Sequence, residues 1–294
     1  MSTTTATLIH ADGRVLAALD VSTYSASVAE MAAWAAARMH ASLEFIHAID
    51  RPTTASGRQD LSGNLALGDR EELLAELTEL DESRSRIAQE SGRRLLTQAK
   101  ALASQSRGIE AESRLRHGAL VDTLLELEAD VRLFVIGKRG EHADFAKGHL
   151  GSNLERVVRA VHRPVLVASR VFKVPERFLI AFDNSATTRR CVDMICASPL
   201  LADLQCHLLM IGDSTREPEG LEWAREQLSD AGFHVDVHVV TGQADTVIAR
   251  HVQEHAIDMI VMGAYGHSRI RSMILGSTTT EVLRSCLVPV LLLR

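Results

Sequence analysis

Short apolar runs alternate with longer segments of helical periodicity along the first part of the chain. Each run is typical of a buried strand, and the segments between them repeat apolar residues at helical spacing. Residues 109–116 are predicted as a strand from their alternation of apolar and polar residues. The predicted strands are residues 15–19, 43–49, 109–116, 132–136 and 164–168, and the predicted helices are residues 25–40, 70–103, 121–128 and 153–161. Strands that alternate with helices predict a parallel sheet covered by helices on both faces.

The second part of the chain repeats this order more compactly. Its predicted strands are residues 178–182, 205–211, 233–240, 258–262 and 288–293, and its predicted helices are residues 187–198, 219–231, 244–255 and 278–285. Five strands fit a doubly wound α/β fold, which binds ligands at the carboxyl ends of its strands, where the strand order reverses. We therefore predict two tandem doubly wound domains, residues 1–170 and 171–294, each with a five-stranded parallel sheet.

An internal repeat relates the two parts. Each opens with an apolar run that ends in an aspartate, Asp20 or Asp183, and each closes with a strand, two glycines, a Gly-Ser pair and Pro-Val-Leu. Repetition in this order indicates two copies of one unit. The glycines and serines of the two loops are Gly137, Gly140, Gly151 and Ser152 in the first copy, and Gly263, Gly266, Gly276 and Ser277 in the second.

The first copy carries an insertion. The two aspartates are 163 positions apart, whereas the first glycines of the two loops are 126 apart, so the first copy is 37 residues longer between these points. A loop at 51–67 and the helix at 70–103 account for the insertion, and the polar stretch 81–86 together with Gly92 predicts a bend or two helices. We expect an amphipathic helix that covers its own domain, with a lid or a partner surface as alternatives.

The glycine loop of the second copy follows a buried strand and precedes a helix. Its glycines leave the backbone open to close approach by a ligand. Ser277 and Thr278 add hydroxyl groups at the start of a helix, whose unpaired N–H groups favour anions. This context favours a phosphate site, and the alternative is a loop that only connects strand to helix. Asp20 and Asp183 suit a ribose hydroxyl; the alternative is that each caps the helix that follows it, and both roles can hold together.

The pattern Gly-x2-Gly-x9-Gly-Ser in the second copy, with Asp183 at the tip of its first strand, resembles the universal stress protein family. The resemblance covers nearly the whole chain as two tandem domains. It implies an adenine nucleotide α-hydrolase-like fold that binds ATP, with or without Mg²⁺, and final strands 165–168 and 290–293 that pair antiparallel in an internal pseudo-dimer. The residues implied to bind ribose, phosphates and adenine are Ala181, Asp183, Ile211, Met262, Gly263, Gly266, Gly276, Ser277 and Thr278.

The first copy matches the family pattern with one departure, because its glycine loop is one residue longer. Glu141 and Asp144 place negative charge in that loop, and Lys138, Arg139 and Lys147 offset it. This copy is therefore either a second nucleotide site or a scaffold. The positions that match the family are Asp20, Ala48, Ile136, Gly137, Gly140, Gly151, Ser152 and Asn153.

Composition narrows the function classes. Hydrophobic residues make up 46% of the 294 residues and charged residues 24%, as in ordinary globular domains. The net charge of −6 disfavours a nucleic-acid binder, although backbone N–H groups can still hold a phosphate. We expect no signal peptide, because residues 1–7 lack a basic region followed by an apolar run, and no membrane span, because no apolar stretch is long enough. Four cysteines without a CxxC pair are expected to be buried thiols, which favours a cytoplasmic location.

Catalytic signatures are missing from the glycine loops. Neither loop carries the Gly-Lys-Ser/Thr sequence of fast phosphoryl transfer, and no nucleophile–base pair stands beside them. We therefore predict a regulatory or sensor protein of the stress response with an adenine nucleotide as its partner, no catalytic residue and at most slow hydrolysis. A slow ATPase or nucleotidyl-transfer enzyme, and a binder of a non-nucleotide small molecule, are the alternatives. Homodimerisation of the whole chain stays open.

Three polar residues alternate along the predicted strand 233–240. His234, Asp236 and His238 share one face of that strand, and His-x-Asp-x-His spacing can hold zinc. The strand is expected at a sheet edge, where a polar, solvent-exposed face is the simpler interpretation. No metal site is therefore assigned from the sequence.

Overall fold

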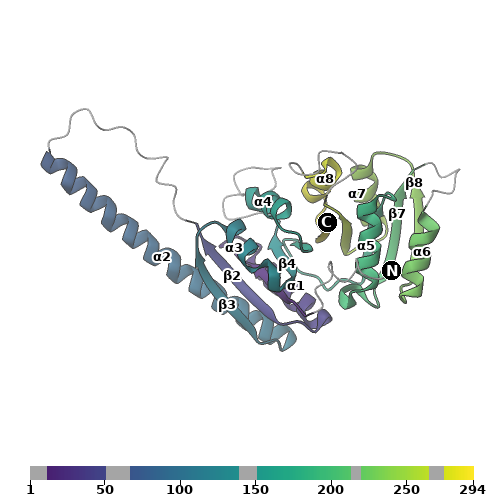
Figure 1. Ribbon diagram of the computed structural model, residues 1–294, viewed down its shortest axis with the longest axis horizontal. Helices are drawn as coiled ribbons and strands as arrows, with labels where there is room; N and C mark the ends of the chain where they lie inside the picture. The colour runs from purple at the N-terminus through teal and green to yellow at the C-terminus, as the bar shows by residue number, and fades with distance from the viewer. Residues whose placement is uncertain (1–11, 51–66, 139–150, 213–219, 265–274) are drawn as a thin grey trace.

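A single mixed sheet runs through the whole molecule. The computed structural model describes residues 12–50, 67–138, 151–212, 220–264 and 275–294. Ten strands form the sheet in the order β3-β2-β1-β4-β5-β10-β9-β6-β7-β8, with helices on both faces (Figure 1). Each half contributes five consecutive strands of this order, as the repeat predicts.

The observed elements follow the predicted order. In the first half they are β1 (Arg14–Ala18), α1 (Ser25–Met39), β2 (Leu43–Ile49), α2 (Leu67–Arg107), β3 (Ala111–His117), α3 (Leu120–Leu127), β4 (Val131–Gly137), α4 (Ser152–Ala160) and β5 (Val165–Ala168). In the second half they are β6 (Arg177–Phe182), α5 (Ala186–Cys196), β7 (Gln205–Ile211), α6 (Leu221–Asp230), β8 (Val235–Val240), α7 (Ala244–Glu254), β9 (Met259–Gly263), α8 (Ser277–Ser285) and β10 (Val290–Leu293). Short 3-10 turns, η2 (Glu128–Asp130) and η4 (Pro199–Leu201), complete the described elements.

The strand order reverses at the first strand of each half. Strand β1 lies between β2 and β4, and β6 lies between β7 and β9, with every neighbour parallel. The predicted fold class, two tandem doubly wound α/β units, is therefore confirmed. Near-continuous burial of strands such as β1 and β5 reflects the helices that cover both sheet faces.

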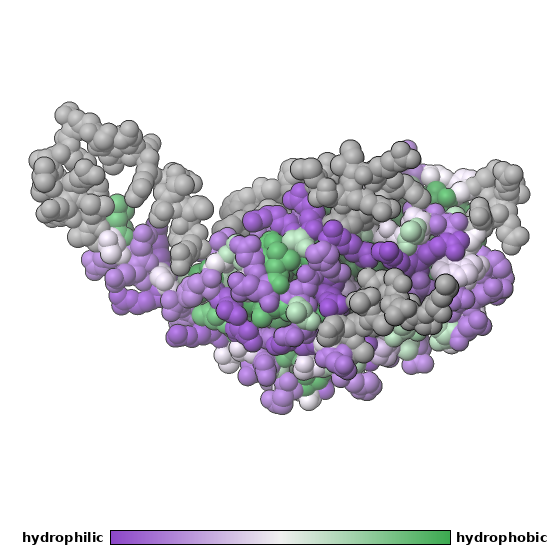
Figure 2. Space-filling model, viewed as in Figure 1, coloured by the Kyte–Doolittle hydropathy of each residue, from purple (hydrophilic) through white to green (hydrophobic). Residues whose placement is uncertain are grey.

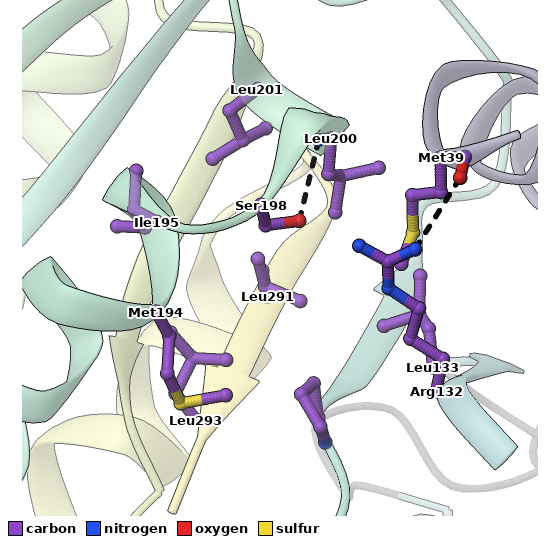
Figure 3. A pocket seen from close by; sticks show the side chains of 11 residues that line it. Met39, Arg132, Leu133, Met194, Ile195, Ser198, Leu200, Leu201, Leu291 and Leu293 are labelled. Atoms are coloured by element: carbon purple, nitrogen blue, oxygen red, sulfur yellow. Dashed lines mark hydrogen bonds between the residues drawn. The ribbon is translucent and has the colours of Figure 1, made fainter. Parts of the chain in front are cut away.

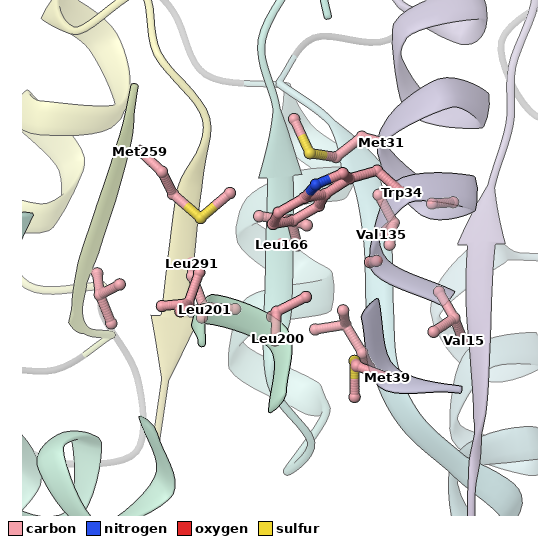
Figure 4. Close-up of a cluster of buried hydrophobic side chains, with 14 of the residues drawn as sticks. Val15, Met31, Trp34, Met39, Val135, Leu166, Leu200, Leu201, Met259 and Leu291 are labelled. Atoms are coloured by element: carbon pink, nitrogen blue, oxygen red, sulfur yellow. The ribbon is translucent and has the colours of Figure 1, made fainter. Parts of the chain in front are cut away.

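The two halves meet through their last strands. Strands β5 and β10 pair antiparallel, with Leu166 opposite Leu291, which confirms the pairing that the resemblance implies. Figure 4 shows these two leucines with Trp34 of α1 and with Leu200 and Leu201 of the second half. The hydrophobic core on this face of the sheet is continuous across the seam. Because the pairing is antiparallel, the strands of the two halves run in opposite directions. The edge formed by the carboxyl ends of the strands in one half therefore lies opposite the corresponding edge of the other half.

The inserted helix α2 is continuous. It spans 41 residues without interruption and runs straight in Figure 1, so the predicted bend or division into two helices at the polar stretch and Gly92 is wrong. Its C-terminal part packs on the sheet through Leu96, Ala99 and Ala103, all buried. Its N-terminal part extends beyond the sheet (Figure 1), and Leu77 and Leu80 there are about half exposed. The expectation that the helix covers its own domain holds for the C-terminal part alone.

Gly92 allows α2 to lie close to the sheet. A Cβ atom at this position would lie 2.7 Å from His47 Cδ2 and 2.8 Å from Leu115 Cδ1. The His47 ring cannot move away easily, because it is buried and its Nδ1 lies 2.8 Å from the Leu19 carbonyl oxygen. A glycine that disfavours a helix in isolation is therefore retained here for packing.

Replacing Gly92 with leucine is expected to lower the free energy of unfolding by about 1–3 kcal/mol through overpacking, despite the better helix propensity of leucine. Urea denaturation followed by circular dichroism measures the change. Gln98→Leu, on the exposed face of the same helix, is the matched control and should change the free energy by less than about 0.5 kcal/mol. Wild-type stability in Gly92→Leu would contradict the packing role.

The surface seen in Figure 2 is mainly hydrophilic and the cysteines are free thiols, as the composition of the chain leads us to expect. Figure 2 shows a face dominated by hydrophilic residues, with apolar residues in small separate patches. Among the described helices, none combines the length and apolarity needed to cross a membrane. All four cysteines are free; three of them are buried, as predicted, whereas Cys196 is only partly buried. Burial raises the pKa of Cys191 to about 12 and that of Cys196 to about 11, so neither is a reactive thiolate at neutral pH.

Candidate functional site

The candidate site of the second half lies where β6 and β9 end. Ile180 and Val261 are paired in register, so Asp183 and Gly263 leave neighbouring strands at the same edge. Ile211 ends the next strand, β7, at this edge. The structure thus brings the described members of the predicted set to one edge: Ala181, Asp183, Ile211, Met262, Gly263, Gly276, Ser277 and Thr278. Gly266 lies outside the described residues.

Helix α8 begins at this edge with its backbone open. The Gly276 N–H donates to the Ala264 carbonyl oxygen over 3.3 Å, and Thr279 Oγ1 donates to the Gly263 carbonyl oxygen over 3.0 Å. These bonds fix the first turn of α8 beside the end of β9. Among the described residues, no side chain caps that turn, so its N–H groups are suited to an anion.

The backbone of Gly276 has φ −55° and ψ 140°, which any L-residue adopts readily. Glycine is therefore not required here for a left-handed conformation. Its distinguishing property at this position is the missing side chain, which leaves the start of the helix accessible. Gly151, at the start of α4 in the first half, has nearly the same geometry, with φ −59° and ψ 128°.

Asp183 is held in a tight turn at the end of β6. Its Oδ1 accepts hydrogen bonds from the Ser185 N–H over 3.0 Å and from Thr188 Oγ1 over 2.7 Å. Ser185, and not Asp183, caps α5, because the Ser185 side chain accepts from the Thr188 N–H. The alternative that this aspartate caps its helix is therefore wrong, and the exposed carboxylate is oriented by an Asx turn instead.

Asp20 repeats this geometry in the first half. Its Oδ1 accepts from the Ser22 N–H over 3.1 Å, and the N-cap of α1 is Tyr24. The capping alternative is wrong here too. The other described positions of this predicted set lie at the carboxyl ends of β2 and β4 or at the start of α4: Ala48, Ile136, Gly137, Gly151, Ser152 and Asn153. Gly140 lies outside the described residues, as do Arg139, Glu141, Asp144 and Lys147.

Lys138 distinguishes the first half from the second. It follows β4 directly, where the sequence analysis counts it among the cations of the glycine loop. In the structure its side chain is buried, and its ammonium group donates a hydrogen bond to the carbonyl oxygen of Cys286, in the second half. This contact ties the carboxyl edge of the first half to the segment before β10, and it turns the Lys138 charge toward the seam.

Arg189 is a cation held near Asp183, and it does not belong to the predicted set of site residues. Arg189 Nε donates to Asn184 Oδ1 over 2.8 Å, and the Arg189 guanidinium lies 4.7 Å from the centre of the Trp223 ring. Asn184 has a left-handed backbone, with φ 59°. Arg189 and Trp223 belong to different helices that meet only in the fold, so no spacing in the sequence indicates this pair.

The sequence profile of the universal stress protein family matches residues 13–169 and 207–294. The chain belongs to this family. It is 36% identical to universal stress protein Slr1230 of Synechocystis over 285 residues, which cover 95% of this chain and 99% of the relative. The family assignment thus extends over both halves, and it supports a role in the stress response.

Solved structures show the same fold at full length. A universal stress protein from Archaeoglobus fulgidus aligns with a TM-score of 0.68 at 21% identity and covers 97% of both chains. The functionally unknown protein PA1789 from Pseudomonas aeruginosa aligns with a TM-score of 0.58 at 17% identity, over 96% of this chain and 93% of its own. The tandem universal stress protein fold is therefore shared with these proteins.

An apolar pocket at the seam of this universal stress protein is distinct from the candidate site. Figure 3 shows Met39 and Leu133 of the first half facing Met194, Leu200 and Leu291 of the second. The pocket has a volume of about 40 Å³, which is room for a water molecule or two and too little for a nucleotide. It includes none of the predicted site residues.

The alternating residues of β8 do not form the metal triad that their spacing allows. His234 precedes the strand and is exposed, whereas Asp236 accepts a hydrogen bond from Gln205 Nε2 over 2.7 Å. His238 stacks parallel to His207, with ring centres 5.3 Å apart. Strand β8 is an edge strand, as predicted, but the predicted solvent-exposed face is wrong for His238, because α7 packs over it.

Proposed function

We propose that this universal stress protein binds ATP at the carboxyl edge of its second half and acts as a regulatory sensor in the stress response. One observation carries the proposal: an uncapped helix start, free of a side chain at Gly276, is fixed next to the oriented carboxylate of Asp183. The first feature suits a phosphate and the second suits a ribose hydroxyl. Residues 1–170 and 171–294 are the two proposed domains.

Each proposed role follows from position. The backbone of the glycine loop at Gly263, Gly266 and Gly276 would let the phosphates approach closely, and the open amides of the first turn of α8, with the Ser277 and Thr278 hydroxyl groups, would hold them. Asp183 would accept from the ribose, and Ala181, Ile211 and Met262 would frame the adenine at the neighbouring strand ends. Mg²⁺, where present, would be held by the phosphates. The first half would act chiefly as a scaffold, since Lys138 points to the seam. Four free thiols favour a cytoplasmic location.

Gly276→Val is expected to weaken ATP binding by at least about tenfold, equivalent to ~1.4 kcal/mol, because the valine side chain fills the space of a phosphate. Valine adopts the observed φ and ψ of this residue without strain, so the fold should be kept. Isothermal titration calorimetry with ATP and Mg²⁺ measures the change, and circular dichroism checks the fold.

Gly151→Val is the matched control, because Gly151 starts α4 with nearly the same backbone geometry. We expect it to leave the affinity for ATP nearly unchanged. A loss of binding in Gly151→Val alone would move the site to the first half. Failure of the wild type to bind ATP, or equal binding by all three proteins, would overturn the proposal. Rapid multiple turnover of ATP would replace the sensor role with an enzymatic one.

A further inference from the structure

Four histidines meet on one face of the sheet in the second half, away from the proposed nucleotide site. His207 comes from β7, His238 from the edge strand β8, and His251 and His255 from α7 and its C-cap. We refer to these four residues as the histidine cluster. His207 lies opposite Asp236 and His238 lies opposite Leu209, so both ring systems project from the same sheet face, the one that α7 covers. On α7 the two histidines are four residues apart and share one side of the helix.

The four rings are close enough to share one ion. One potential ligand atom from each ring lies within 4.8 Å of those of the other three. The shortest contact described, from His251 Nε2 to His207 Nδ1, is 3.3 Å. Nitrogen atoms on a tetrahedral zinc ion are about 3.3 Å apart, given Zn–N distances of about 2.0–2.1 Å. Small side-chain rotations would therefore bring the remaining nitrogens to ligand distance.

Two buried ring nitrogens of the histidine cluster lack a hydrogen-bond partner among the described residues. His207 and His251 are each only 4% exposed. The Nε2 atoms of His207 and His238 are buried and have no hydrogen-bond partner among the described residues. A buried polar atom without a partner costs about 1–3 kcal/mol, so an apolar side chain would be the more stable choice if these rings only filled space.

Burial disfavours the protonated form of three of the four rings, and each of these three has a lowered pKa. Burial, reinforced by His255, His238 and His207, lowers the pKa of His251 to about 4. Burial and neighbouring histidines also lower the pKa of His207 and of His238, against a smaller opposite effect of Asp236. Neutral imidazole with a free lone pair is the form that coordinates a metal ion.

An acidic residue stands behind His207. Asp236 Oδ2 lies 3.8 Å from His207 Nε2, on the side of the ring away from the His251 contact. The same carboxylate accepts a hydrogen bond from Gln205 Nε2, and Gln205 in turn accepts from Arg177 Nε. A carboxylate that orients a ligating histidine through its second nitrogen is the usual support of a zinc ligand. Asp236 would become such a positioning residue for His207 by closing this gap to hydrogen-bond distance, which would also satisfy the buried Nε2 atom.

We propose that the histidine cluster binds one Zn²⁺ ion through four imidazole nitrogens. Four protein ligands would leave no open coordination position, so the ion would be structural and not catalytic. It would link α7 to β7 and to the edge strand β8. Strand β8 has a strand neighbour on one side only, so a metal crosslink would add stability where the sheet has fewest contacts. Imidazole ligands also accept Cu²⁺, Ni²⁺ and Co²⁺, which makes Co²⁺ a suitable spectroscopic probe.

The test is zinc titration of the full chain, expressed without a histidine tag and stripped with a chelator. We expect one Zn²⁺ per chain by isothermal titration calorimetry, a higher melting temperature with zinc, and the intense visible absorption of tetrahedral Co²⁺ on substitution. A chain that binds no zinc, or binds Co²⁺ with a weak octahedral spectrum, would overturn the proposal. ATP binding is measured separately, so this test is independent of the proposed function.

Matched variants locate the ion. His238→Gln and His255→Gln should each weaken zinc binding by roughly a hundredfold or more and abolish the zinc-dependent rise in melting temperature. Both positions are half-buried, and His255 lies at a helix end, so its variant is expected to fold even if the other does not. Asp236→Asn should weaken binding by about tenfold or more. His234→Gln, an exposed histidine outside the cluster, should bind as the wild type does; equal binding by His255→Gln would overturn the proposal.

Discussion

Leu166→Asp is expected to abolish the native fold at the seam of the two halves. Leu166 is fully buried, lies opposite Leu291 and belongs to the core shared by both halves (Figure 4). An ionised carboxylate there would have no cation to pair with in the apolar cluster drawn around it, and its desolvation would cost several kcal/mol. That loss is comparable with the whole stability of an ordinary domain, about 5–15 kcal/mol. Circular dichroism and thermal unfolding would report the loss.

Two controls separate charge from position. Leu166→Ala leaves a cavity without a charge, so it should lower the free energy of unfolding by about 2–5 kcal/mol and keep the fold. Leu287→Asp places the same charge three residues before β10, on a side chain that is 89% exposed, and should change the free energy by less than about 0.5 kcal/mol. A Leu166→Asp protein that melts like the wild type would show that the antiparallel seam is wrong.

Local patterns in the sequence predict most of the fold. Apolar runs, or alternation of apolar and polar residues, identify all ten described strands, with ends that differ by at most two residues. Central strands such as β1 are apolar throughout because helices cover both faces of the sheet, whereas the edge strands β3 and β8 also carry polar residues. The duplicated motifs add the tandem order. The bend in α2 is wrong because Gly92 weakens a helix only in isolation, whereas here its missing side chain makes room for His47.

The residues of the candidate site fall into two groups, those that a sequence motif predicts and those that only the folded chain brings together. Asp183 and Gly276 are predicted because each belongs to a motif whose residues are close in sequence. Arg189 stacks on Trp223, and Lys138 reaches the Cys286 carbonyl oxygen, only after the helices have packed. The histidine cluster contains residues of both groups. The spacing around His238 indicates metal chemistry in the sequence, whereas His207 and His251 come from other elements and join it only in the fold. Spacing along one strand indicates the wrong partners wherever a helix covers that strand.

Asp258→Ala is expected to destabilise the connection between the halves. Asp258 precedes β9, and its side chain is 5% exposed. One carboxylate oxygen accepts from Lys173 Nζ over 2.5 Å, and the other accepts from the N–H groups of Glu176 and Arg177 over 3.0 and 3.1 Å. The alanine variant leaves two backbone donors at the start of β6 without this acceptor, so the free energy of unfolding at pH 7 should fall by about 2–4 kcal/mol. Urea denaturation measures it.

The lysine partner should matter much less than the aspartate. Lys173 is 70% exposed, so water and salt screen its charge, and Lys173→Met should lower the free energy of unfolding by less than about 1 kcal/mol. A larger loss for Lys173→Met than for Asp258→Ala would show that the ion pair, and not the two amide contacts, holds the segment.

The dependence on pH gives a second test of the same contact. Burial alone would raise the pKa of Asp258, but the hydrogen bonds from Lys173 and from the two amides outweigh it and lower the pKa. A lowered pKa in the folded state means that the ionised form contributes its full stability above the ordinary aspartate pKa of about 3.9 and loses it as the pH falls through the folded-state value. The stability difference between the wild type and Asp258→Asn, which cannot titrate, should therefore shrink below about pH 5. A difference that stays constant down to pH 3 would contradict an ionised Asp258 as the anchor of this segment.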